Sequence, residues 1–132
     1  MTPEVQFFPA QDEERKLRLL LRASVVEDVL LLHCSGRVTF CDEAAVLLTK
    51  VCALLPHTRQ LVLDLSGVQK MDCAGIGALA AVVRQAQEHL CALKLVAPEH
   101  VLRLLEITRL DSVLEVHPNP EEAMLAFAAQ MA

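Results

Sequence analysis

The sequence is poor in aromatic residues, with four Phe and neither Trp nor Tyr among its 132 residues. Single-stranded nucleic acids are usually bound by aromatic side chains that stack on the bases, and phosphate backbones are bound by clusters of Lys and Arg. The net charge is −5, and the densest basic stretch, residues 15–18, directly follows the acidic residues 12–14. We therefore predict that this protein does not bind nucleic acid.

Long apolar segments are also missing. The purest apolar run, residues 74–83, is about half the roughly 20 residues that a membrane-spanning helix requires, and it contains two Gly. The first residues do not combine a basic start with an apolar run, so no signal peptide is predicted. These features favour a cytoplasmic protein that does not insert into a membrane.

Metal and nucleotide motifs are absent as well. The five cysteines, an odd number at wide spacings, contain no CxxC pair, which argues against a zinc site or a disulfide framework: Cys34, Cys41, Cys52, Cys73 and Cys91. Asp64 and Asp72 are a carboxylate pair without further ligands, which is a weak metal signal. There is no GxxxxGK[ST], and the spacing of Gly75 and Gly77 does not extend to GxGxxG because position 80 is Ala. The sequence predicts no metal and no cofactor, and it predicts that both glycines allow a helix to approach a sheet closely.

What the sequence does contain is an alternation of strands and helices. Apolar runs predict strands at residues 17–22, 29–34, 61–65, 93–96 and 113–116, the first two forming a hairpin. Helices are expected from a capping-box-like Thr39-x-x-Asp42 to Pro56, over residues 74–90, from Pro98, and from Asn119-Pro120 onward. We predict an α/β fold: one mixed sheet of about five strands with about four helices largely on one side. Residues 1–14 are expected to form a loose lead-in to a single domain over residues 15–132.

The most informative segment is residues 61–83, LVLDLSGVQKMDCAGIGALAAVV. It predicts a buried strand, a turn, and a helix that opens near Asp72 and Cys73. Backbone N–H groups are unpaired at a helix start, so such a corner can recognise an anion or be modified itself. A catalytic Cys73 would also need a base, and no histidine stands at a position that suggests pairing with it, so we predict that the protein is not an enzyme.

Three motifs in this order resemble the STAS family, the domain of bacterial anti-sigma-factor antagonists, over residues 17–127. They are residues 63–68 (LDLSGV) followed by Met71-Asp72-x-x-Gly75-Ile76-Gly77, the expected turn at residues 35–38 (SGRV), and residues 99–115 with the acidic start at residues 121–124. The resemblance implies a mixed sheet and a regulatory role. In such proteins the residue after the signature Asp is a Ser or Thr that a partner kinase phosphorylates, and the added charge of about −1.5 to −2 abolishes binding.

This chain departs from the family pattern at that residue. Cys73 occupies the position equivalent to the phosphoacceptor, and Ala74 follows it, so the loop has no hydroxyl group. Arg109 also stands where the family usually has Gly. We therefore predict a non-catalytic regulatory binding module of the anti-sigma-factor antagonist type that binds its partner constitutively.

The resemblance implies a partner, and it leaves alternatives open. The first partner is an anti-sigma factor that is also a serine kinase of the histidine-kinase-like ATPase type. The alternative is a small cytoplasmic STAS subunit of a lipid-transport ABC complex, which binds and stabilises the ATPase subunit. A third hypothesis makes Cys73 a redox switch, and homodimer formation through the apolar helices also stays open. The predicted partner-binding residues are Ser35, Gly36, Arg37, Asp72, Cys73, Ala74, Gly75, Ile76 and Gly77.

Overall fold

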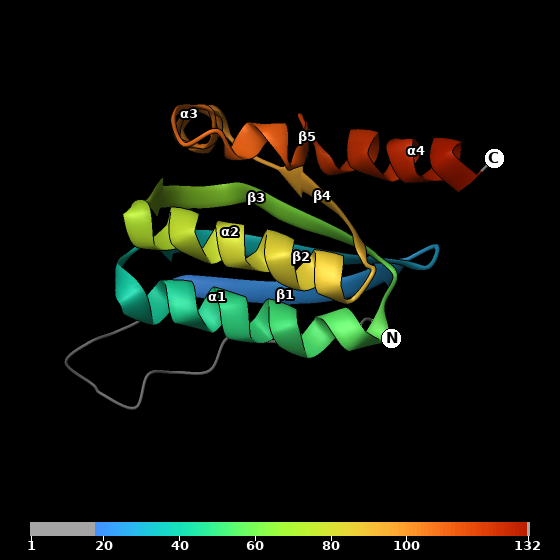
Figure 1. Ribbon diagram of the computed structural model, residues 1–132, viewed down its shortest axis with the longest axis horizontal. Helices are drawn as coiled ribbons and strands as arrows, with labels where there is room; N and C mark the ends of the chain where they lie inside the picture. Colours follow the sequence, from blue (N-terminus) through green and yellow to red (C-terminus); the bar gives the residue numbers. More distant parts are fainter. Residues whose placement is uncertain (1–17, 132) are drawn as a thin grey trace.

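The computed structural model describes residues 18–131, with the side chains of residues 18–129, so the predicted lead-in at residues 1–14 lies outside the described residues. Figure 1 shows one mixed sheet and its helices. The strands are β1 (Leu19–Val26), β2 (Val29–Val38), β3 (Gln60–Met71), β4 (Ala92–Val96) and β5 (Glu115–His117). The helices are α1 (Phe40–Leu54), α2 (Cys73–Glu88), α3 (Glu99–Ile107) and α4 (Pro120–Met131), with short 3₁₀ turns η1 (Leu55–His57) and η2 (Leu110–Ser112).

The strands lie in the order β1-β2-β3-β4-β5, with β1 antiparallel to β2 and the other neighbours parallel. The predicted hairpin is confirmed: Glu27 and Asp28 join β1 to β2 with φ angles of 51° and 69°. Positive φ at both central residues is typical of the tight turn that matches the twist of paired strands. The predicted mixed five-stranded α/β fold is therefore correct.

Two apolar clusters occupy the two faces of the sheet. The larger one contains side chains from α1, α2 and α3, such as Leu47, Leu79 and Leu105. In the smaller cluster Phe127 of α4 packs with Val62 and other strand residues, so α4 covers the opposite face. Right-handed crossovers between parallel strands place their helices on one face, and α4 follows the last strand. No helix within residues 18–131 is long and apolar enough to cross a membrane.

Two predicted turns are wrong, because the strands continue through them. Residues 35–37 lie within β2, and β3 runs from Gln60 to Met71 instead of ending at Leu65. The pairing of β2 with β3 shifts register between His33 and Ser35. This shift allows both strands to continue through the Ser-Gly segments. Gly36 has a φ of 105°, and a Cβ there would lie 1.9 Å from the Arg18 carbonyl oxygen. This glycine permits a close approach of β1 instead of a chain reversal.

The start of α1 is where the sequence placed it, but with a different hydrogen-bond partner. Thr39 is the N-cap, and its N–H and hydroxyl donate to Glu43 Oε1 at 3.0 and 2.7 Å. The predicted partner was Asp42. Glu43 is 2% exposed, and its other carboxylate oxygen accepts the Arg18 N–H at 2.8 Å. A buried carboxylate thus fixes the junction between β2 and α1.

Helix ends contain residues in strained backbone conformations. Leu90, predicted to end the helix over residues 74–90, instead lies two residues after α2; it is 87% exposed and has a φ of 56°. The Cys91 N–H donates to Ala86 O and the Leu90 N–H to Gln87 O, which is a left-handed helix termination usually made by Gly. Arg109, which follows α3, has the same left-handed backbone conformation, with a φ of 64°. Gly adopts this left-handed conformation without strain, which explains why a resembling family would have Gly at this position. Arg109 adopts it at a cost of about 1 kcal/mol.

A buried lysine connects the sheet to α4. Lys94 in β4 is 2% exposed, and its ammonium group lies 2.5 Å from Glu115 Oε2 and 4.6 Å from the centre of the Phe127 ring. The Lys94 hydrogen bond, more than that of His117, holds the pKa of Glu115 below its usual range. An unpaired buried charge is costly, so this contact fixes α4 on its face of the sheet.

Candidate functional site

The signature segment lies at the edge of the sheet where β2 and β3 end. Because these strands are parallel, the helices that follow them, α1 and α2, begin side by side (Figure 1). Asp72 is the N-cap of α2, as predicted, and its Oδ1 accepts the Gly75 N–H at 3.1 Å. Its Oδ2 accepts the Phe40 N–H at the start of α1 at 2.8 Å. One carboxylate therefore joins two helix starts, which we call the docking corner (residues 40–41 and 72–77).

The environment of Asp72 favours its ionised form. The Phe40 hydrogen bond lowers the pKa of Asp72 most. Burial opposes it with a smaller effect, and the backbone N–H groups of Gly75 and Ala74 lower this pKa further. Both carboxylate oxygens are occupied by backbone donors, so Asp72 is an anchor for the corner.

The two glycines of the signature differ, which corrects one prediction. A Cβ at Gly75 would lie 2.5 Å from the Val38 carbonyl oxygen and 2.6 Å from Met71 Cγ, so close helix-to-sheet approach requires this glycine. At Gly77 a Cβ would meet nothing within 4 Å, and the residue is exposed. Gly77 leaves a bare backbone on the outer face of α2.

Phe40 is a site residue that the sequence analysis missed. Its ring is 66% exposed at the start of α1, and its φ is 58°. A bulky residue rarely adopts this conformation, and such strain concentrates at functional sites. The bond from the Phe40 N–H to Asp72 stabilises the strained backbone. The only sequence signal was an apolar residue at the second position after β2.

Two thiols are exposed at the starts of α1 and α2. Cys73 is the first residue of α2 and Cys41 the second of α1, whereas Cys34 and Cys91 are buried and Cys52 is half-buried. Burial, with a smaller contribution from Asp64, raises the pKa of Cys34, and burial also raises that of Cys91. Cys41 and Cys73 are thus the exposed thiols among the described residues.

The other predicted partner-binding residues fall into two groups. Ala74 is half-buried, and Gly75 and Ile76 are buried beneath the corner. Ser35, Gly36 and Arg37 are half-buried within β2. Contact between a partner and these residues stays a prediction.

Asp64 and Asp72, the carboxylate pair that was a weak metal signal in the sequence, do not belong to one set of metal ligands among the described residues. Asp64 is 4% exposed; it accepts the Ser66 N–H at 2.9 Å and lies 2.8 Å from His33 Nδ1. Within residues 18–131, no three His, Cys, Asp or Glu side chains form a cluster that could hold a metal ion. Asp64 is a structural acid of β3, separate from the Asp72 corner.

Comparisons with known proteins agree with this architecture. Residues 21–115, well over half of the chain, match the family model described as "Mlab, STAS domain". An anti-sigma factor antagonist from Mycobacterium paratuberculosis superposes with a TM-score of 0.74 at 23% identity, over 82% of this chain and 92% of that one.

Three further structures, of two proteins, have a similar fold. The unphosphorylated form of the Bacillus antagonist SpoIIAA gives a TM-score of 0.68 at 13% identity, over 83% of this chain and 96% of that one. A structure of its phosphorylated form is also similar, with a TM-score of 0.63 at 13% identity, over 81% of this chain and 98% of that one. The murine anion transporter Slc26a9 gives 0.70 at 23% identity, over 82% of this chain and 19% of that protein. With its fold, its signature corner and its match over residues 21–115, this chain belongs to the STAS domain family.

Proposed function

We propose that this chain is a non-catalytic regulatory module of the anti-sigma-factor antagonist type, which binds a partner protein through the docking corner. The partner class is an anti-sigma factor and serine kinase of the histidine-kinase-like ATPase type. The observation that carries the proposal is the exposed Cys73 at the first residue of α2, next to Asp72, whose carboxylate accepts the N–H of the exposed Phe40. The site offers an apolar surface for association and no hydroxyl group for phosphorylation.

The charge at position 73 is expected to control partner binding. A phosphate group on a docking surface adds about two negative charges and reverses its complementarity to a partner. The Bacillus antagonist exists in both phosphorylated and unphosphorylated forms. A thiol at the equivalent position of this chain offers a kinase no hydroxyl group to modify, so we expect binding to be constitutive.

Kinase treatment tests the missing switch. The protein and its Cys73→Ser variant are incubated with a candidate kinase of this class and ATP, and intact masses are measured. We expect no phosphate on the wild type and one on Cys73→Ser, because serine supplies the absent hydroxyl. A stoichiometric phosphate on any corner residue of the wild type would contradict the proposal.

Cys73→Asp is expected to weaken partner binding at least ~tenfold, since it mimics part of the phosphate charge.

Phe40 provides a second test, in which stability and binding change in opposite directions. Phe40→Gly relieves the left-handed strain and should stabilise the fold by roughly 1 kcal/mol. The same substitution removes an exposed aromatic anchor and should weaken partner binding by about 2 kcal/mol, or thirtyfold. Urea unfolding and calorimetric titration measure the two effects. Leu125→Ala, an equally exposed apolar residue on α4, is the matched control and should leave binding unchanged.

A role in a transport assembly is the second candidate function, and the STAS fold within the murine transporter supports it. In this case the partner is the ATPase subunit of a lipid-transport ABC complex. Titration of the protein against an ABC ATPase subunit and an anti-sigma kinase, side by side, separates the candidates. The same Phe40→Gly and Cys73→Asp variants report whether the docking corner mediates the tighter interaction.

A further inference from the structure

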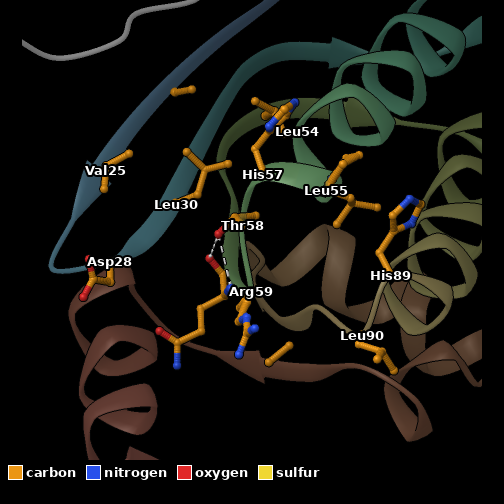
Figure 2. A pocket seen from close by; sticks show the side chains of 14 residues that line it. Val25, Asp28, Leu30, Leu54, Leu55, His57, Thr58, Arg59, His89 and Leu90 are labelled. Atoms are coloured by element: carbon orange, nitrogen blue, oxygen red, sulfur yellow. Dashed lines mark hydrogen bonds between the residues drawn. The ribbon is translucent and has the colours of Figure 1, made fainter.

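A pocket of about 1120 Å³ opens at the edge of the sheet opposite the docking corner (Figure 2). It lies where α1 and α2 end and where β3 and β4 begin, beside the β1–β2 hairpin. This volume is slightly above the range of about 300–1,000 Å³ that is typical of pockets for small molecules. None of the residues of the docking corner lines it.

The floor of the pocket is apolar. Leu30 and Leu55, which line it, are 8% and 1% exposed and belong to the main core cluster, against which the partly buried Leu54 packs. Leu90 lies at the rim with its side chain 87% exposed and its φ at 56°. An exposed leucine held in a strained conformation beside an apolar floor is well placed to cover an apolar ligand.

The rim is predominantly basic. His57, Arg59 and His89 line the pocket together with a single acid, Asp28. In Figure 2, Asp28 lies at the hairpin end of the view and His89 at the opposite end, with Arg59 between them. Among residues 18–131, no carboxylate forms an ion pair with the Arg59 guanidinium. A permanent cation beside an apolar floor is complementary to an anion that carries an apolar chain.

The nearby helix end does not oppose an anion strongly. Carbonyl groups at a helix C-terminus carry partial negative charge. In α2 they already accept hydrogen bonds: Gln85 O from the His89 N–H at 3.0 Å, and Ala86 O from the Cys91 N–H at 2.9 Å. The His89 Nδ1 also lies 3.0 Å from Gln85 O, so the Arg59 guanidinium is the main group that meets an anionic ligand.

We propose that this pocket binds a single-chain amphiphile with an acidic head group, with the carboxylate or phosphate beside Arg59 and the chain over Leu30 and Leu55. Leu90 then packs against the chain from the rim. The pocket and the docking corner lie at opposite edges of the sheet, so the proposal stands independently of the partner-binding function.

The test is a titration of the ¹⁵N-labelled full chain, followed by amide NMR shifts. The probes are decanoate and monodecyl phosphate below their micelle concentrations, with decan-1-ol and inorganic phosphate as references. We expect at least one acidic amphiphile to shift amides of residues 54–60 and 89–92, and both references to bind at least ~tenfold more weakly. The tighter of the two amphiphiles identifies the head group as carboxylate or phosphate.

Two variants locate the head group and the chain. Arg59→Gln should weaken binding of the better amphiphile about tenfold, and Ala92→Phe, which fills the pocket from its rim, should do the same. Arg84→Gln, an exposed cation on α2 outside the pocket, should bind as the wild type does. Equal affinity for decan-1-ol, equal affinity in Arg59→Gln, or shifts confined to the docking corner would each overturn the proposal, and so would the absence of any shift. None of these outcomes bears on partner binding by the corner.

Discussion

Gly75→Ala is expected to destabilise the protein by about 3 kcal/mol or more, whereas Gly77→Ala, two residues further along the same helix, should stabilise it by roughly 0.5–1 kcal/mol. At position 75 the new methyl group would lie 2.5 Å from the Val38 carbonyl oxygen. That atom is backbone, so the end of β2 or the start of α2 must move. At position 77 the methyl group meets nothing within 4 Å, and only the gain in helix propensity remains.

Urea unfolding followed by circular dichroism measures both effects. The two variants make the same chemical change in the same helix, so each is the control of the other. Equal free energies of unfolding for the two would contradict the close approach of α2 to β2. Gly75→Ala should also weaken partner binding because it displaces the docking corner.

Asp72→Ala is expected to lower the free energy of unfolding by about 2.5–4 kcal/mol. The substitution removes a helix N-cap, worth about 1 kcal/mol, and a charge-assisted bond to the Phe40 N–H, worth about 1.5–3 kcal/mol. For a chain of this size the thermal midpoint should fall by roughly 8 °C, which calorimetry can measure. Asp72→Asn keeps one acceptor oxygen and can satisfy one of the two N–H groups, so its loss should be about half as large.

The same carboxylate predicts a dependence of stability on pH. The pKa of Asp72 is lower in the folded protein than in the unfolded chain, chiefly because of the Phe40 hydrogen bond. Its contribution is therefore complete above the unfolded value, about pH 4, and is lost as the pH falls through the lower folded value. The difference in unfolding free energy between wild type and Asp72→Ala should shrink on acidification. Glu106→Gln, an exposed charge change on α3, should show no such trend; a constant Asp72 difference between pH 7 and pH 2.5 would disprove the linkage.

Patterns within a few residues predicted much of the fold. The apolar alternation gave the strands and their hairpin, and helix starts such as Asn119, whose side chain accepts the Glu122 N–H at 2.8 Å, are encoded by adjacent residues. The cap at Asp72 was predicted in the same way. In these places the physical cause of the structure lies within one turn of the chain.

Features caused by distant residues were not predicted. The Ser-Gly pairs at Gly36 and Gly67 have the composition of turns, but each allows a neighbouring chain to come close: a Cβ at Gly67 would lie 2.9 Å from Ser35 Cβ. The exposed, strained Phe40 depends on a bond to a carboxylate 32 residues away. A buried lysine such as Lys94 needs a partner and an aromatic ring that only the folded sheet supplies. Local patterns carry no information on such contacts.

The position of α4 has a consequence for biosynthesis. The five strands and the three helices on the larger apolar cluster are complete once residue 117 has been made, while the opposite face still lacks Ala123 and Phe127. Chains fold as they emerge from the ribosome, at about 5–20 residues per second. Until α4 docks, the sheet therefore carries Val62, Val96 and the Lys94 ammonium uncovered on one side, a surface that chaperones can recognise.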